Sequence, residues 1–152
     1  MKRMLLAAAL LLVPALSFAD NIDKYVELMR SDMRTNKTAV LTEYMKLSEA
    51  DGTKFWPIQR DYENALAKLQ DQRLAMIKDY AANFDSLTDK KATEITKQAF
   101  KLADQRTALL KSTTSKIAKA VSPKVAARFA QVEGFMQALV DVKVRGQVPL
   151  PQ

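Results

Sequence analysis

One phrase occurs twice in the chain and sets its architecture: residues 68–78 read KLQDQRLAMIK, and residues 101–111 read KLADQRTALLK. Each copy is followed by an apolar residue and then a hydroxyl residue, first Leu87-Thr88 and then Val121-Ser122. A third such pair, Leu47-Ser48, lies upstream. A hydroxyl after an apolar residue is typical of a helix start, because its oxygen accepts a hydrogen bond from an unpaired backbone N–H. The repeated unit is therefore a long helix with its turn, and we expect Ser48, Thr88 and Ser122 as N-caps.

Apolar residues between these starts recur at the spacing of amphipathic helices. The four expected helices lie in residues 22–47, from 49 to about 84, from 89 to about 120, and from 123 to about 140. The predicted stripe of the first helix is Ile22, Val26, Met29, Met33, Val40, Tyr44 and Leu47, and that of the last is Phe129, Val132, Met136 and Leu139. Pro57 falls inside the second; we favour a kinked helix, and the alternative is a fresh start with Thr53 as cap. Short turns between long helices make neighbours antiparallel. The predicted fold is all-α, an elongated set of antiparallel hairpins or a bundle of about four helices.

The ends of the chain differ in composition from its middle. Residues 1–19 combine Lys2 and Arg3 with an apolar run and small residues before Asp20, which predicts a secretory signal peptide cut after Ala19. A membrane anchor is the alternative, but the run is shorter than the ~20 residues a spanning helix needs. Residues 20–145 then form one helical domain, and residues 146–152, with two prolines, an extended tail. The absence of Cys suits a helical protein of a bacterial periplasm.

Positive charge gathers in one part of the sequence. The chain holds 24 basic and 17 acidic residues, and without Lys2 and Arg3 the net charge is +5. The excess lies in the third expected helix. Its basic face is either a solvated surface or a surface for acidic or unfolded partners, whereas nucleic acid is not expected for an exported protein. The lysines assigned to the second interpretation are Lys90, Lys97, Lys101, Lys111, Lys116 and Lys119.

Four apolar side chains are candidates for contacts with partner proteins. Met29 and Met33 could form an adaptable surface, because thioether side chains repack against varied neighbours, although core packing is the commoner role. Phe55 and Trp56 directly precede Pro57; Phe55 lies on the apolar stripe of the second helix, Trp56 lies off it, and core packing is the alternative for both. These four residues, with the six lysines, are the predicted binding surface.

The repeated Asp-Gln-Arg triplets should face each other. If the second and third helices fold back about Leu87, Gln72 falls near residues 102–105, so the two triplets meet. Arg73 and Arg106 occupy positions where the spacing calls for an apolar residue, so each needs a partner or must reach solvent. We predict reciprocal ion pairs, Arg73 with Asp104 and Arg106 with Asp71, which fix the register of the hairpin more than they stabilise it.

Side chains used in most catalytic sites are missing. The chain has no His and no Cys, which excludes imidazole-based triads, cysteine nucleophiles and the usual zinc ligand sets. Three glycines and no acidic loop give neither a phosphate-binding loop nor a calcium loop. Carboxylates such as Asp61 and Glu63 point apart on a helix. We therefore expect no enzyme activity, no metal and no cofactor.

The three turn phrases resemble the Leu-Thr-x-x-Gln motif of periplasmic Spy/CpxP-type proteins. They begin at Leu47, Leu87 and Val121, and the motif glutamine is replaced by Asp51, Lys91 and Val125. That resemblance implies an all-helical fold, a cradle-shaped dimer, and activity as an ATP-independent chaperone or envelope-stress regulator. The metal-binding residues of that group are missing from this chain, so the resemblance implies no metal.

These observations favour a non-enzymatic periplasmic protein that binds unfolded envelope proteins, as a chaperone or stress adaptor. The alternative is a dedicated regulatory partner of one folded envelope protein, for example a sensor kinase domain, and a third hypothesis is a carboxylate-based hydrolase. A homodimer is possible under the first two hypotheses, and neither requires insertion into a membrane.

Overall fold

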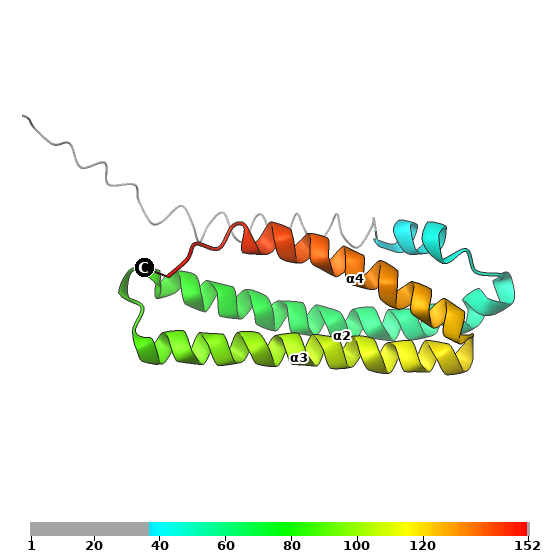
Figure 1. The fold of residues 1–152 in the computed structure, drawn as a ribbon, viewed down its shortest axis with the longest axis horizontal. Coiled ribbons are helices and arrows are strands. Elements are labelled where there is room, and N and C mark those ends of the chain that lie inside the picture. Colours follow the sequence, from blue (N-terminus) through cyan, green and yellow to red (C-terminus); the bar gives the residue numbers. More distant parts are fainter. Residues whose placement is uncertain (1–36, 152) are drawn as a thin grey trace, which may run out of the picture.

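The computed structural model describes residues 37–151, which form an elongated, antiparallel helical bundle (Figure 1). Residues 37–45 are helical and are followed by α2 (Glu49–Ala82), the short 3-10 helix η1 (Phe84–Ser86), α3 (Asp89–Ala120) and α4 (Pro123–Arg145). No strand occurs within this described range. The predicted all-α bundle is confirmed. The predicted signal peptide, Met29 and Met33 lie outside the described residues.

All three predicted N-caps are present. The side-chain oxygens of Ser48, Thr88 and Ser122 each accept a hydrogen bond, 3.2 Å long, from the backbone N–H three residues later. Leu47 and Val121, which precede two of these caps, pack against the hydrophobic core and so fix how the chain approaches each helix. The apolar–hydroxyl pairs therefore start the helices as the sequence predicted.

The helix α2 continues through Pro57 without a new start. It is capped at Ser48, and Thr53 donates its hydroxyl to the carbonyl of Glu49 inside the helix, so the alternative start with Thr53 as cap is wrong. Pro57 is exposed on the bundle surface, where water can satisfy the carbonyl that its missing N–H leaves free.

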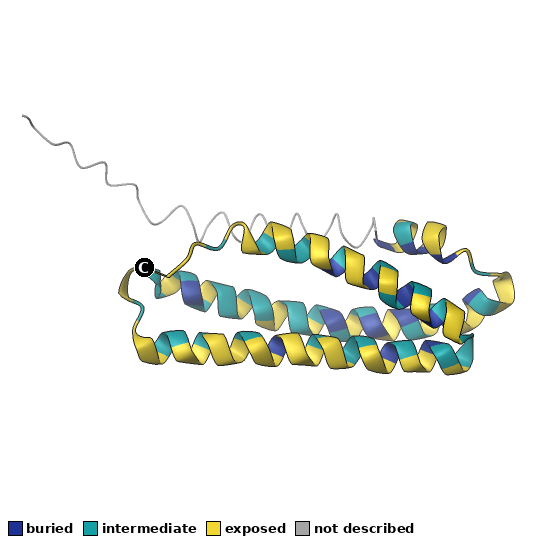
Figure 2. Ribbon diagram, in the orientation of Figure 1, coloured by how far each residue is buried: buried dark blue, intermediate teal, exposed yellow. Residues whose placement is uncertain are grey.

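Tight packing is concentrated in the half of the bundle that contains the α3–α4 turn (Figure 2). Phe55, Tyr62 and Phe129 meet there edge to face, with ring centroids 5.8 Å apart for Phe55–Phe129 and 5.4 Å for Tyr62–Phe129. Each such pair contributes roughly 0.5–1.5 kcal/mol beyond the burial of apolar area. Leu66 and Ile117 complete this core beside the aromatic rings.

The helix over residues 37–45 buries a different face from the one predicted. The sequence assigned Val40 and Tyr44 to the packed stripe, but Tyr44 is 59% exposed, and the buried residues are Lys37, Leu41 and Met45. These three are spaced four apart and therefore share a side of the helix. The sequence pattern missed this face because the stripe was predicted from apolar residues alone, and one of its three buried residues, Lys37, is charged.

Wide spacing between α2 and α4 leaves room for large side chains. No Cα atom of α2 lies within 8 Å of a Cα atom of α4, whereas α3 packs closely against both helices.

The segment after α4 contacts the C-terminal part of α2, where the Tyr80 hydroxyl donates a 2.9 Å hydrogen bond to the carbonyl of Pro149. The chain makes a turn at Gly146 and Gln147 after α4, and its last described residues therefore dock back onto α2.

Candidate functional site

A buried carboxylate organises the space between α2 and α4. Glu133, on the inner side of α4, is 0% exposed. Its Oε1 atom accepts hydrogen bonds from the Tyr62 hydroxyl at 2.8 Å, from Gln137 Nε2 at 2.9 Å and from Lys37 Nζ at 2.9 Å. Its Oε2 atom has no hydrogen bond of good geometry but lies 2.9 Å from the same Lys37 nitrogen. The charge of Glu133 is thus compensated without solvent.

Lys37 joins a second carboxylate to this group. Its ammonium lies 2.6 Å from Glu63 Oε1 and 5.4 Å from the centre of the Tyr62 ring. Burial raises the pKa of Glu63, against the opposing effect of the Lys37 charge. Burial and the neighbouring Glu133 carboxylate raise the pKa of Tyr62, so its hydroxyl remains a proton donor. We call Lys37, Tyr62, Glu63, Glu133 and Gln137 the Glu133 network.

Both arginines of the repeated triplets bind Asp141 on α4. Arg73 Nη1 lies 2.6 Å from Oδ1, and Arg106 makes a bidentate contact with distances of 3.1 and 2.9 Å. The predicted ion pairs of Arg73 with Asp104 and of Arg106 with Asp71 are therefore wrong, because both arginines pair with Asp141 instead. Asp71 and Asp104 are both exposed, whereas Asp141 on α4 reaches Arg73 on α2 and Arg106 on α3. A prediction based on the hairpin of α2 and α3 alone could not include Asp141.

The surroundings of Asp141 stabilise its charged form. Burial alone would raise its pKa, but hydrogen bonds from Arg106 and Arg73 outweigh burial, so the pKa of Asp141 is lowered. The hydrogen bond to Asp141 in turn raises the pKa of Arg106. A 3.5 Å contact from Arg106 Nη1 to Gln137 Oε1 connects these ion pairs to the Glu133 network. One polar chain thus runs along the inside of the bundle.

This polar chain is suited to holding helices in register. Each of its carboxylates is bound to a cation, and Glu133 has no access to solvent. Within residues 37–151, no group of three or more acidic side chains is arranged to hold a metal ion. A slip of one helix would strand a desolvated charge, which costs several kcal/mol. The arrangement specifies how the 37–45 helix, α2, α3 and α4 fit together.

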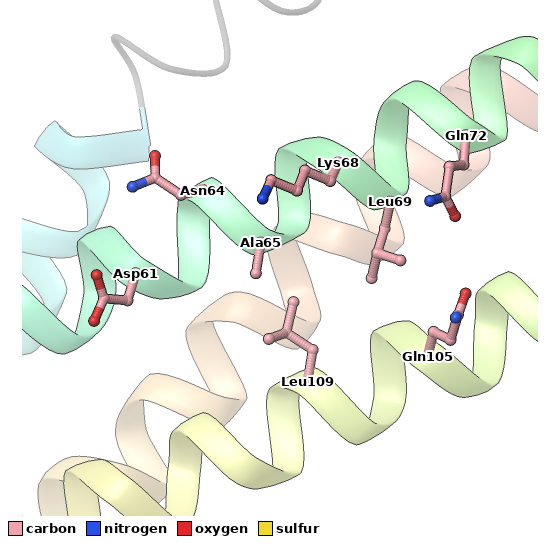
Figure 3. A pocket seen from close by; sticks show the side chains of 8 residues that line it. All are labelled: Asp61, Asn64, Ala65, Lys68, Leu69, Gln72, Gln105 and Leu109. Atoms are coloured by element: carbon pink, nitrogen blue, oxygen red, sulfur yellow. The ribbon is translucent and has the colours of Figure 1, made fainter.

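A shallow groove of about 480 Å³ lies between α2 and α3 (Figure 3). Gln72 and Gln105, the central residues of the two triplets, point into it from opposite helices, beside Leu69 and Leu109. The predicted register of the hairpin is therefore confirmed, although its ion pairs are not. The groove is open, with amide and aliphatic walls and with Asp61 and Lys68 on the α2 side, and it offers adaptable contacts rather than a closed ligand site.

The predicted binding residues divide into two groups. All six lysines, Lys90, Lys97, Lys101, Lys111, Lys116 and Lys119, are exposed on α3. Phe55 is 0% exposed at the centre of the core, so its assignment to a binding surface is wrong. Trp56 is half-buried, edge to face with Phe55 at 5.1 Å, and lines a second hollow with Leu47 and Pro57.

Sequence reasoning missed the exposed apolar residues of the bundle. Phe100 on α3 is 68% exposed, and Phe135, Leu139 and Val142 on α4 are exposed as well. The α4 stripe was assigned to Phe129, Val132, Met136 and Leu139, of which Leu139 is half exposed. The useful signal was the pair of acids Glu133 and Asp141, eight residues apart, which mark a second possible inner stripe on the same helix.

The chain matches no known family model, no curated protein and no solved structure. No helix within residues 37–151 combines the length and apolar character needed to cross a bilayer.

Proposed function

We propose that this protein is a non-enzymatic helical binding protein of the bacterial periplasm, processed after Ala19, which acts as an ATP-independent chaperone or envelope-stress adaptor of the Spy/CpxP type. The exposed basic side of α3 is the observation that carries this proposal. Six lysines lie there, away from the buried Leu102, Thr113 and Ile117. Such a surface attracts partners with acidic segments.

The basic surface is strongest at the α3–α4 end of the bundle. No Asp or Glu occurs between Gln105 and Val132, and Lys111, Lys116, Lys119 and Lys124 in that span are all exposed. In the first half of α3, by contrast, Glu94 and Asp104 interrupt the lysines. Encounter with an acidic partner is therefore favoured at the α3–α4 end, and raising the salt concentration weakens it.

Exposed apolar side chains supply the contacts that hold an unfolded segment after encounter. Phe100 lies between Lys97 and Lys101 on α3, and Trp56 presents part of its ring beside Pro57 on α2. Aromatic side chains next to lysines combine a large apolar area with charge, which suits segments of mixed composition. Phe55 has no part in this surface because it is buried.

Suppression of client aggregation tests the proposal. The processed chain, without nucleotide or metal, should suppress aggregation of an acidic unfolded client near equimolar ratio, and less well at molar salt, where the screening length falls to ~3 Å. Replacing Lys111, Lys116 and Lys119 with Gln should weaken suppression more than replacing Lys90, Lys97 and Lys101. Absence of suppression with several acidic clients at low salt contradicts the chaperone function.

A dedicated folded partner is the second candidate function. The regular spacing of Phe135, Leu139 and Val142 on α4 favours it, because one defined complementary surface can cover such a stripe. Capture of a single folded envelope protein, with no effect on unfolded clients, would support this candidate. Binding of several unrelated unfolded clients supports the first.

A further inference from the structure

The outer side of α4 carries an apolar stripe that nothing in the described chain covers. Phe135, Leu139 and Val142 are 66%, 50% and 73% exposed. Their spacing of four and then three residues places them on one side of the helix. We call these three residues the α4 outer stripe. Large apolar residues gathered in one place on a surface mark interaction sites, whereas single exposed ones need no explanation.

Charges around the α4 outer stripe all have the same sign. The only acids of α4 are Glu133 and Asp141, and both are turned inward and bound by cations. The exposed charges near the stripe are those of Lys143 and Arg145, in the last turn of the helix. A complementary surface must therefore combine apolar side chains with carboxylates.

The helix surface beside the stripe is low enough for a close approach. Gly134 is exposed, and a Cβ atom added there would meet nothing within 4 Å, so no neighbour within the described chain requires a glycine. A glycine inside a helix costs about 1 kcal/mol relative to alanine. The exposed Ala138 continues the same low surface toward Leu139. A second helix could lie against α4 at this level.

We propose that the α4 outer stripe docks an amphipathic, acidic helical segment of a partner protein. Its apolar residues cover Phe135, Leu139 and Val142, and its carboxylates meet Lys143 and Arg145. The inference rests on the proposed function, because it adds the α4 outer stripe to the basic side of α3 as a second site at which that function binds its partner.

Charge and area favour such a segment over other occupants. A second copy of the chain would bring the same acid-free surface, so the cations of neither copy would find a carboxylate. An anionic lipid surface would also attract the cations, but three apolar residues on a helix fixed in a bundle offer little area for insertion compared with an interfacial helix.

Peptide binding to the processed chain tests this assignment. The probe is a labelled 18-residue peptide with leucines on one helical side and glutamates on the other, and the matched peptide carries lysines in place of the glutamates. The acidic peptide should bind more tightly. Leu139→Asp and Phe135→Ser should weaken its binding by about tenfold or more, as expected for central anchor residues. Tyr44→Ser, at a residue of similar exposure (59%) on the helix over residues 37–45, should change binding less than about twofold, as expected away from the interface core.

A photo-crosslinking residue at position 142 identifies the occupant directly. Crosslinks to the acidic peptide support the proposal. Crosslinks to a second copy, to residues 20–36 of the same chain, or to phosphatidylglycerol vesicles in preference to the peptide would overturn it, as would equal binding by wild type and the two α4 variants.

Aggregation assays with the same variants separate this inference from the function on which it rests. If Leu139→Asp and Phe135→Ser suppress client aggregation as well as wild type does, the site assignment fails and the proposed function stands. If wild type suppresses no aggregation but binds the acidic peptide through the stripe, the chaperone function fails and the docking site stands.

Discussion

The two sides of α4 reverse the usual distribution of residues in a bundle. Its inner side holds Glu133, Gln137 and Asp141, all hydrogen-bonded to other helices. Its outer side holds Phe135, Leu139 and Val142, all exposed. Along the first two turns the helix is conventional, with Ala126 and Phe129 buried in the core. The reversal begins at Glu133, where the aromatic core ends.

Each side of α4 is suited to different partners. Buried polar groups persist when every charge is compensated, and they then reject helix registers that would leave one unpaired. Exposed apolar groups contribute little to the isolated fold, and a stripe of them marks an interaction site. Inner-side substitutions should therefore affect stability, and outer-side substitutions should affect binding.

Among the polar residues on the inner side of α4, the largest expected loss of stability comes from Glu133→Gln. The substitution removes the charge that compensates Lys37 on this side and places an amide NH₂ among hydrogen-bond donors. Removing one partner of a fully buried ion pair lowers the free energy of unfolding by about 3 kcal/mol. Chemical denaturation of the two proteins measures the difference in the free energy of unfolding.

Glu63→Gln is the matched control, because Glu63 contacts the same ammonium at 2.6 Å from a more exposed position. Burial raises the pKa of Glu63, so its charged form is disfavoured in the fold, and its loss should cost less than about 1 kcal/mol. Equal losses for the two variants would show that the burial of Glu133 does not determine the free energy lost when a carboxylate beside Lys37 is removed.

The next largest effect is expected for Asp141→Asn. This change leaves Arg73 and Arg106 without the carboxylate that both bind, and it should cost about 2 kcal/mol, between the values for exposed and for buried pairs. Asp104→Asn, at an exposed position of the repeated triplet, should change stability by less than about 0.5 kcal/mol. A double-mutant cycle with Arg106→Met measures the coupling, and additivity would disprove the pair.

Acid should remove the Asp141 contribution in a defined range of pH. The folded-state pKa of Asp141 is lowered, so its contribution is fully present above the unfolded-state value of about 3.9 and is lost as the pH falls through the folded-state pKa. The stability difference between wild type and Asp141→Asn should therefore be constant from pH 7 to about 5 and shrink below about 4. Urea denaturation at a series of pH values measures it, and a difference that does not change with pH would contradict this role.

Helix starts and hairpin register could be predicted from the sequence because local chemistry determines them. Ser48, Thr88 and Ser122 cap their own helices, so three or four consecutive residues contain the signal. Gln72 and Gln105 meet because two helices joined by a short turn pair residues equidistant from it. Neither inference needs knowledge of a third helix.

Residues whose roles depend on a third helix could not be assigned in this way. Arg73 and Arg106 were correctly expected to need an acidic partner, but Asp141 is 35 residues beyond the nearer one and arrives on α4. Phe55 lies on the predicted apolar stripe of the second helix, and its assignment to a binding surface is wrong because Phe129, which arrives on α4, covers it in the fold. Lys37 was missed because a charged residue is rarely buried unless it is paired, and its acidic partners Glu63 and Glu133 lie on other helices.

Substitutions in the α4 outer stripe should have the smallest effect on stability if the outer side of α4 serves binding rather than folding. Phe135→Ser and Leu139→Gln remove apolar side chains that are already largely in water, so the transfer free energy lost on folding is small. Each should change the free energy of unfolding by less than about 0.5 kcal/mol, as for other surface positions. Phe129→Ala, on the inner side of the same helix, should cost about 3 kcal/mol or more, since it empties space between Phe55 and Tyr62.

Thermal unfolding of the outer-stripe variants at two protein concentrations shows whether any loss of stability depends on self-association. A loss above about 1 kcal/mol at Leu139 that grows with protein concentration would mean that self-association covers the stripe, because only a state of higher order links stability to concentration. A concentration-independent loss of that size would place Leu139 in an intramolecular contact, and the outer side of α4 would then belong to the fold rather than to a partner.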